Sequence, residues 1–195
     1  MSQGKKQNLI IIISAPSGSG KTTIVNRLLE QTSGLRCLVS YTTRPRRQGE
    51  TGEKDYIFIS NEEFKKKIET GDFLEWEEVF GNLYGSSEEQ LKEALGAKED
   101  IILSIDVKGA RQVREKYPGS VSIFIMPPSK DELAARLKKR NTDMESEMSV
   151  RLKESGREMA AAEEYDYLIV NEDLDKAVKE LQSIIETERK NREKK

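Results

Sequence analysis

The 195-residue chain contains no histidine and only one cysteine, Cys37. Without histidine, the protein lacks the side chain that serves most often as a general base and as a transition-metal ligand. A single cysteine excludes an intrachain disulfide and a cluster of cysteines around zinc. Because Cys37 stands among apolar residues, we expect an inert thiol in the core. No segment approaches the ~20 consecutive apolar residues that cross a bilayer.

A strong charge of either sign is also absent. The net charge is −2, with 35% charged and 35% hydrophobic residues, which is typical of a soluble protein. Such a chain is not attracted to nucleic acid as a whole, so any anion binding has to be local. Lys5, Lys6 and the apolar run after them resemble a signal peptide, but the run is too short. We therefore expect a cytoplasmic protein with no nucleic-acid or membrane partner, of open oligomeric state.

The most informative segment runs from the apolar residues 9–13 into Gly-Ser-Gly-Lys-Thr at residues 18–22. Its spacing is that of a Walker A loop, whose backbone N–H groups bind phosphates in front of a helix. A plain Gly/Ser-rich turn is the alternative. Ala15 stands where glycine is usual, and alanine fits if its φ is negative. Lys21 would reach the β- and γ-phosphates of a nucleoside triphosphate, and the Thr22 hydroxyl would hold Mg²⁺. The predicted triphosphate site comprises Ser14, Ala15, Pro16, Ser17, Gly18, Ser19, Gly20, Lys21, Thr22 and Thr23.

Short apolar strands alternate with amphipathic helices along most of the chain, which favours an α/β fold with a parallel sheet. We expect core strands at residues 9–14, 35–39, 101–105, 121–126 and 167–170. Helices are expected at residues 22–31, 108–116, 130–140, 145–163 and 174–192, the third beginning at a capping box of Ser129 and Glu132. The result is one domain with a five-stranded P-loop sheet flanked by helices, whose core comprises residues 1–39, 90–127 and 164–195.

Two regions interrupt this alternation. Residues 40–89 hold alternating segments at 55–59 and 73–77 around a short helix capped by Ser60 and Glu63. That pattern indicates a small mixed α/β insertion, a place where a second substrate often binds. Residues 128–163 hold many charges and few bulky apolar side chains between Arg136 and Arg157. A helical hairpin of that composition has little to bury, so we expect a mobile lid over the site.

Two further motifs suit phosphate chemistry. Arg44 and Arg47 lie in a loop between Ser40 and Tyr56, and guanidinium groups suit bidentate phosphate binding. For an arbitrary loop, a solvated basic surface is the alternative. Asp106 follows the apolar run 101–105, as in a Walker B motif, and would act on Mg²⁺ directly or through water. Two anion sites, one for a triphosphate and one for a monoester, indicate phosphoryl transfer between them.

With these motifs in view, the chain resembles the guanylate kinase family from end to end. The loop of residues 40–56 is similar to the family's nucleoside-monophosphate signature. Residues 75–76, 81–86, 105–110, 140–142 and 170–174 also fit the family pattern. The resemblance implies Mg²⁺-dependent transfer of a phosphoryl group from ATP to GMP or dGMP. It also implies that the GMP site lies in residues 40–89 and the lid in residues of about 128–163.

The resemblance also implies a role for each matching residue. The GMP phosphate would be bound by Arg44, Arg47, Tyr56 and Tyr84, and the guanine would be read by Ser40, Glu75 and Ser86. Asp106 would lie between GMP and the metal. Arg136, Arg140 and Arg151 would close with the lid on the ATP phosphates, and Asn171 would lie near the adenine. The catalytic set would be Lys21, Arg44, Arg140 and Arg151.

Glu75 carries the expected base specificity. A carboxylate accepts hydrogen bonds from guanine N1–H and the N2 amino group, whereas adenine offers a lone pair at N1. The Ser86 hydroxyl can donate to guanine O6. The alternatives are an exposed strand carboxylate for Glu75, core aromatic rings for Tyr56 and Tyr84, and solvated helix charges for the lid arginines.

Two residues depart from the family pattern, and two other functions stay open. Ser104 stands where relatives often carry an acidic residue, and Asn141 replaces the usual glycine after the lid arginine. One alternative function is a guanylate-kinase-like module that binds proteins without activity. Such modules typically lose the Walker A lysine or the lid arginines, which this chain keeps. The other is a P-loop kinase for a different phosphorylated acceptor, which would leave Glu75 and Ser86 unexplained.

Overall fold

The structure is a computed structural model that describes residues 8–47, 49–52, 55–139 and 145–194. Its main sheet has five strands, β1 (Ile10–Ser14), β2 (Leu35–Cys37), β7 (Asp100–Ser104), β8 (Val121–Met126) and β9 (Tyr167–Val170). They lie in the order β2-β7-β1-β8-β9, and all neighbouring pairs are parallel. The predicted five-stranded parallel sheet is therefore confirmed, with strand ends within two residues of the predicted ones.

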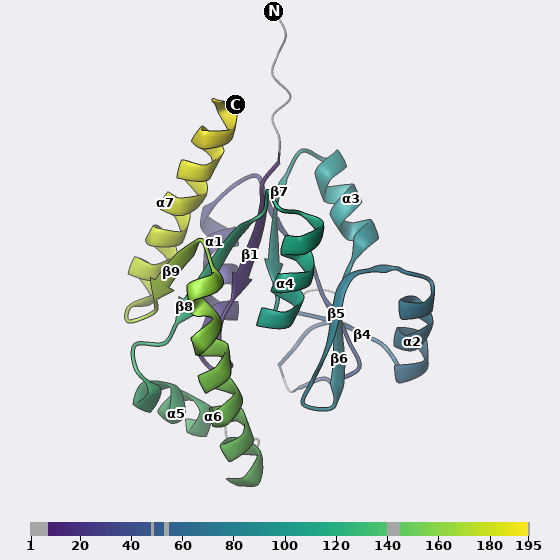
Figure 1. Cartoon of the computed structure of the whole chain (residues 1–195), viewed down its shortest axis with the longest axis vertical. Helices are drawn as coiled ribbons and strands as arrows, with labels where there is room; N and C mark the ends of the chain where they lie inside the picture. Colours follow the sequence, from purple (N-terminus) through teal and green to yellow (C-terminus); the bar gives the residue numbers. More distant parts are fainter. Residues whose placement is uncertain (1–7, 48, 53–54, 140–144, 195) are drawn as a thin grey trace, which may run out of the picture.

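Strand β1 shows how the core is built, because all five of its residues are buried. Successive side chains of a strand point to opposite faces of the sheet. Ile11 and Ile13 pack in one cluster with α1 (Lys21–Gln31) and with Leu181 of α7 (Leu174–Glu193). Ile10 and Ile12 pack in a second cluster with α3 (Glu88–Gly96) and α4 (Val107–Lys116). Helices thus cover both faces of the sheet (Figure 1), which is why β1 is apolar throughout.

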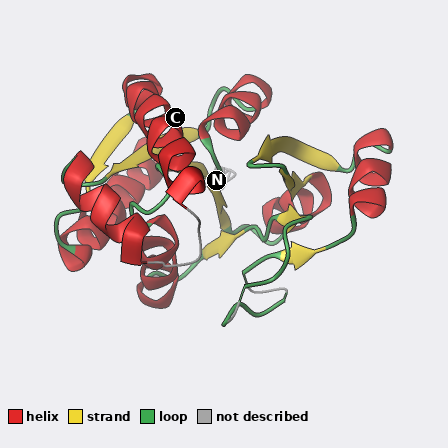
Figure 2. Cartoon of the chain, turned by 90° about the horizontal axis from the view of Figure 1, so that it is seen from below, coloured by secondary structure: helices red, strands yellow, loops and turns green. Residues whose placement is uncertain are grey.

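A second, four-stranded sheet lies to one side of the main sheet (Figures 1 and 2). Its order is β4 (Ile57–Phe58), β3 (Tyr41–Thr42), β6 (Asn82–Ser87) and β5 (Phe73–Val79). Strands β3 and β4 are parallel and the other pairs antiparallel, so the predicted mixed insertion is confirmed. Helix α2 (Asn61–Glu69) begins at the predicted capping box of Ser60 and Glu63. Its Phe64 ring stacks on Phe73 with centroids 4.4 Å apart.

The sequence does not predict strand β6 or helix α3. β6 reads Asn-Leu-Tyr-Gly-Ser-Ser, and it is a strand because a tight turn folds it back on β5, where Val79 pairs with Asn82. The two turn residues, Phe80 and Gly81, have φ of 50° and 74°, the left-handed angles typical of two-residue hairpin loops. Helix α3 begins where the Ser87 hydroxyl accepts the Gln90 N–H at 3.3 Å.

A helical projection connects β8 to β9 (Figure 1). It comprises α5 (Lys130–Lys139), α6 (Glu145–Ala160) and a 3₁₀ helix, η1 (Ala161–Glu164). The Ser129 hydroxyl accepts the Glu132 N–H at 3.0 Å, as predicted for the start of α5. The predicted helix over residues 145–163 instead ends at Ala160 and tightens into η1, a frequent form of a last helical turn.

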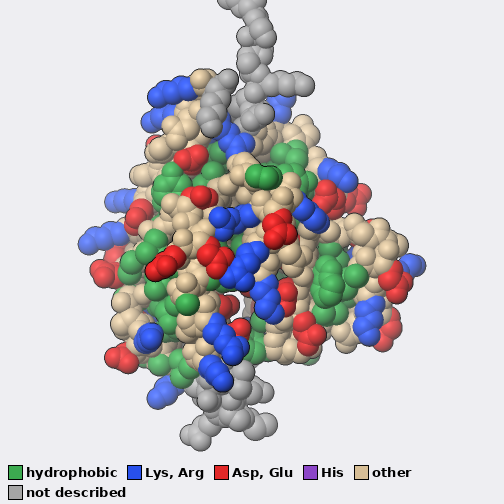
Figure 3. All heavy atoms as spheres, in the orientation of Figure 1, with side chains coloured by type: hydrophobic (Ala, Val, Ile, Leu, Met, Phe, Trp, Pro, Cys, Tyr) green, Lys and Arg blue, Asp and Glu red, His purple; other side chains and the backbone are tan. Residues whose placement is uncertain are grey.

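Acidic and basic side chains are interspersed on the face shown in Figure 3, in keeping with a net charge of −2. Within the described ranges, no helix has the length and apolar character needed to cross a membrane. Cys37 is half-buried at the end of β2 and is a free thiol. Burial raises the pKa of this thiol to about 11, which keeps it protonated and agrees with the expected inert residue.

Candidate active site

The loop between β1 and α1 has the backbone that phosphate binding requires. Gly18 and Gly20 have φ of 90° and 95°, a left-handed conformation that favours glycine. The Ser19 N–H donates to the Pro16 carbonyl at 3.1 Å, which closes the loop. Ala15 is buried and does not have a positive φ, so alanine replaces glycine there without strain. The first N–H groups of α1 have no acceptor within the helix and are available to an anion bound in the loop.

The end of β9 holds this loop in place. Asn171 is 6% exposed, and its Nδ2 donates to the Ser19 carbonyl at 2.7 Å. A side chain at Gly20 would approach the same Nδ2 to 2.6 Å, so the contact needs glycine. Arg136 Nη1 of α5 lies 3.4 Å from the same carbonyl. The expected role of Asn171 near an adenine stays a prediction, to which the structure adds a contact with the phosphate loop.

Lys21 lies where the phosphate loop meets the end of β7 and helix α6. Its Nζ donates to the Ile105 carbonyl at 2.9 Å. Burial lowers the pKa of Lys21, and the charges of Asp106 and Glu158 oppose that change. Burial also raises the pKa of Glu158 to about 7, opposed by Lys21 and by a hydrogen bond from the Ser17 N–H. Helix α6 thus sets the Glu158 carboxyl group against the phosphate loop, a contact between distant segments that no sequence pattern predicted.

Asp106 sits beside the phosphate loop because β7 and β1 are neighbouring strands. The Ser14 hydroxyl lies 3.4 Å from the Asp106 carbonyl. Asp106 also caps α4, since its Oδ1 accepts the Gly109 N–H at 2.8 Å. One carboxylate oxygen is therefore engaged in holding the helix, a structural task that the predicted Walker B role did not include. Ser104, the residue that departs from the family pattern, is half-buried at the end of β7.

Three of the predicted base-reading residues meet on the small sheet. Glu75 of β5 is paired in register with Ser86 of β6, and the hydroxyls of Ser40 and Ser86 lie 3.5 Å apart. Glu75 is 4% exposed. Burial raises its pKa to about 7, although hydrogen bonds from Ser86 lower it, and Asp106 adds to the rise. The alternative of an exposed strand carboxylate is therefore wrong for Glu75.

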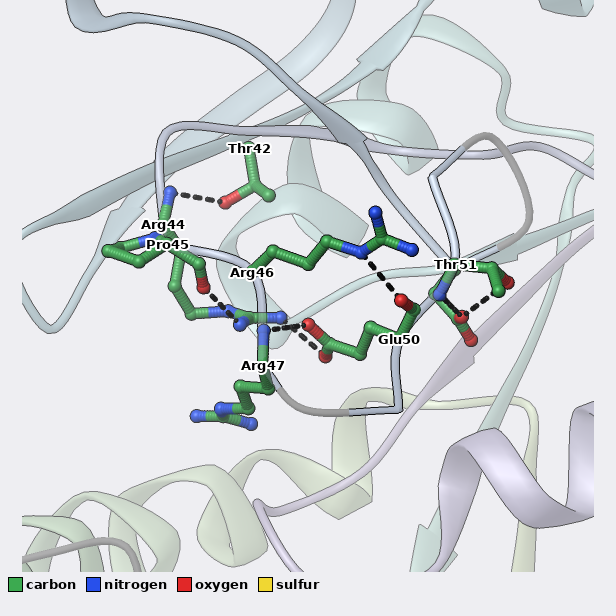
Figure 4. A network of polar contacts seen from close by, with 8 residues as sticks. Thr42, Arg44, Pro45, Arg46, Arg47, Glu50 and Thr51 are labelled. Carbon is green, nitrogen blue, oxygen red and sulfur yellow. Dashed lines mark hydrogen bonds and ion pairs between the residues drawn. The ribbon is translucent and has the colours of Figure 1, made fainter.

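The loop after β3 holds Arg44 in a cage of protein groups (Figure 4). Its Nη2 donates to Glu50 Oε1 at 2.7 Å, and its Nη1 donates to the Pro45 carbonyl at 2.7 Å. The guanidinium carbon lies 5.4 Å from the centroid of the Tyr56 ring, and the Tyr84 ring stands edge-on to Tyr56 at 5.8 Å. The structure thus brings together three of the predicted phosphate ligands, while the fourth, Arg47, is exposed.

Glu50 organises this loop and was not among the predicted site residues. Its Oε2 accepts the backbone N–H of Arg47 at 2.8 Å while its Oε1 binds Arg44. Although burial raises the pKa of Glu50, the hydrogen bonds from Arg44 and from the Arg47 N–H hold it below its usual value. A carboxylate three and six residues from two arginines in one loop is the signal that could have indicated it.

The described residues cover only part of the predicted set of lid arginines. Arg136 pairs with Glu132 at 3.0 Å, one turn earlier in α5. Its Nη1 also lies near the Ser19 carbonyl of the phosphate loop. Arg140 and Asn141 lie outside the described residues, and Arg151 lies in α6 with its side chain outside the described part. The convergence of three lid arginines on one anion stays a prediction.

Sequence comparison with known proteins relates the chain, over almost all of its length, to the family that its motifs resemble. A sequence model of the family described as guanylate kinase matches residues 7–188. The chain is 49% identical over 185 residues to a guanylate kinase from Neisseria gonorrhoeae (95% of this chain, 90% of that one). It is 46% identical over 185 residues to one from Geobacter metallireducens (95% and 91%).

Solved structures agree with these sequence comparisons. A crystal structure of guanylate kinase from Anaplasma phagocytophilum aligns with a TM-score of 0.79 and 36% identity, covering 95% of this chain and 88% of that one. A shikimate kinase from Bacteroides thetaiotaomicron aligns with a TM-score of 0.50 and 15% identity, covering 91% and 98%, a likeness of fold alone. From the phosphate loop to the last helix, the chain belongs to the guanylate kinase family.

Proposed function

We propose that this chain transfers the γ-phosphoryl group of ATP to GMP, forming ADP and GDP, and that it accepts dGMP, which has the same base and phosphate. The observation that carries the proposal is the buried Glu75 carboxyl group, paired with Ser86 and close enough to Asp106 and Lys21 to sense their charges. Membership of the family supports the same reaction.

Guanine is the base that suits this pair of side chains. Ionised Glu75 would accept hydrogen bonds from N1–H and from the N2 amino group, and the Ser86 hydroxyl would donate to O6. Adenine has a lone pair at N1 and no amino group at C2, so both hydrogen bonds to Glu75 would be lost. A buried charged group left without its partner costs ~3 kcal/mol or more, which favours GMP over AMP by about 100-fold.

The phosphoryl transfer itself needs no protein nucleophile and no general base. The phosphate of GMP, with a second pKa near ~6, is already largely a dianion at neutral pH, so the lack of histidine has no cost. Alignment and charge neutralisation remain. Arg44, Arg47, Tyr56 and Tyr84 would hold the acceptor phosphate, with Arg44 already fixed by Glu50. Lys21 and the lid arginines Arg136, Arg140 and Arg151 would neutralise the transferred group, and the closed lid would exclude water.

Mg²⁺ fits the oxygen atoms available beside the phosphate loop. Thr22 lies exposed in the first turn of α1, and Asp106 has one carboxylate oxygen beyond the one that caps α4. Among the described residues, no group of three or more acidic, cysteine or histidine side chains is arranged to bind a metal. Mg²⁺ beside a nucleotide is usually held by one or two side chains, water and the phosphates themselves. Bound there, Mg²⁺ would offset negative charge on the ATP phosphates.

A panel of acceptors tests the proposal. ADP formation is measured with ATP and GMP, dGMP, AMP, UMP or a sugar phosphate, with Lys21→Met as the inactive control. We expect GMP and dGMP to be used and the others to be at least about 100-fold poorer. ADP formation that does not depend on GMP, or a preference for another acceptor, would contradict it.

Because ATP and GMP would be the substrates, we also propose that the enzyme works in the cytoplasm, where both nucleotides occur.

A further inference from the structure

Gly109 lies in the first turn of α4 and is buried against the carboxyl group of Glu75. A Cβ atom built at position 109 would lie 2.4 Å from Glu75 Oε2 and 3.0 Å from Glu75 Cδ. Neither distance is compatible with a side chain at position 109 and the present position of Glu75. The backbone angles of Gly109 are not left-handed, and helix propensity alone would favour alanine. The space beside Glu75 is therefore the physical reason for glycine.

Glu75 has no simple way to move aside. The residue is 4% exposed, and its carboxyl group is hydrogen-bonded to Ser86. The strand that carries it is attached to α4 by Gln112, whose Nε2 donates to the Trp76 carbonyl at 2.9 Å and whose Oε1 accepts the Trp76 N–H at 3.4 Å. Lys116 of α4 also donates to the Leu74 carbonyl. These contacts on both sides of Glu75 fix the distance between β5 and α4.

We propose that Gly109 is a positioning residue that determines base specificity, because its missing side chain lets the Glu75 carboxylate stand at the N-terminal turn of α4. This inference rests on the proposed reading of guanine by Glu75. A carboxylate at the start of a helix is favoured by the helix dipole. Any side chain at position 109 pushes that carboxylate out of reach of the base, while the phosphate loop, closed by its own hydrogen bond from Ser19 to Pro16, keeps its structure.

The test compares Gly109→Ala with Gly96→Ala. Gly96 is the last residue of α3, also lacks a left-handed φ, and a Cβ there meets nothing within 4 Å. We expect Gly109→Ala to raise KM for GMP by about 10- to 100-fold, the loss of a hydrogen bond to a charged group. It should leave KM for ATP within about twofold and reduce the preference for GMP over AMP. Gly96→Ala should change none of these. An unchanged KM for GMP in Gly109→Ala, or an equal rise in KM for ATP, would overturn the inference.

A double-mutant cycle separates this inference from the role of Glu75 itself. Glu75→Ala removes the carboxyl group that collides, so adding Gly109→Ala to it should have no further effect on KM for GMP. An additive effect would show that Gly109 acts through something other than Glu75, and would refute the inference while leaving the reading of guanine intact. If Glu75→Ala alone leaves KM for GMP unchanged, the proposed reading of guanine fails. Should Gly109→Ala not fold, recovery of folding in the double variant would still report the collision, and failure to recover would oppose it.

Discussion

Replacing Glu75 with glutamine should make the ligand-free protein more stable and, at the same time, a poorer kinase. Glu75 is 4% exposed, and burial raises the pKa of its carboxyl group from 4.5 to about 7. Glutamine has nearly the same shape and no charge to bury. It cannot accept from both guanine donors, however, because its amide group places an N–H opposite one of them. We expect kcat/KM for GMP to fall by about 100-fold or more.

The stability gain follows from the difference between the two pKa values. In the unfolded chain the carboxyl group ionises near 4.5, and in the folded protein near 7, so the folded state binds more protons between these values. Stability therefore falls as pH rises through this window, and the whole loss is present above pH 7. At ~1.4 kcal/mol per pH unit, ionising the buried group costs about 3 kcal/mol. Below pH 4.5 the group is neutral in both states and costs nothing.

Urea unfolding of both proteins between pH 5 and pH 8 measures this difference. The variant should be more stable than the parent by about 3 kcal/mol at pH 8 and by much less at pH 5. Glu158, whose pKa is also raised to about 7 by burial, is present in both proteins and cancels in the comparison. A stability difference that does not change with pH would refute the reasoning, whatever its size.

Four further substitutions test other parts of the site. Lys21→Met should fold and lose at least about 10²-fold in kcat, because it removes the cation beside the transferred group; near-normal turnover would contradict that role. Arg47→Ala should raise KM for GMP about tenfold with little change in the urea midpoint, since its side chain is exposed, whereas Arg44→Ala should be nearly inactive and lose stability by leaving Glu50 without its cation. Asn171→Ala should raise KM for ATP about tenfold and leave KM for GMP unchanged, because only the Ser19 carbonyl loses its nearer donor; an equal effect on both constants would indicate a wider disturbance.

The main sheet is predictable because a strand buried on both faces has a simple composition. Residues such as Ile10 to Ile13 are apolar without alternation, and only a sheet covered by helices buries them all. β6 escaped prediction because its strand character comes from pairing with β5 rather than from its own polar residues. Helix α3 could have been found, since Ser87 and the spacing of Leu91, Ala94 and Leu95 indicate a capped, one-sided helix.

Site residues were predictable where one local motif carries the chemistry, and not where distant segments meet. The Walker A motif indicates Lys21, because the glycine-rich loop and the helix that follows it are local properties of the sequence. The contact of Asn171 with Ser19 joins residues 152 positions apart. Similarly, Glu158 of α6 contacts the phosphate loop at Ser17. Gly109 is a similar case, because its need for a hydrogen in place of a side chain depends on Glu75 of another strand. Sequence patterns indicate which face of an element is buried, but not which remote side chain it meets.

Burial shifts the pKa of three groups in the site, and the substrates are suited to reverse two of these shifts. Burial opposes the charge on Lys21, Glu75 and Glu158 when no ligand shares the site. Phosphates would give Lys21 counter-charges, and guanine would give Glu75 two hydrogen-bond donors, so both ionised forms become favourable in the complex. Each substrate would therefore relieve an electrostatic cost that the free protein carries. Part of the binding free energy would come from this relief, so the expected specificity for guanine and the cost of burying a charge would both lie in the same residue, Glu75.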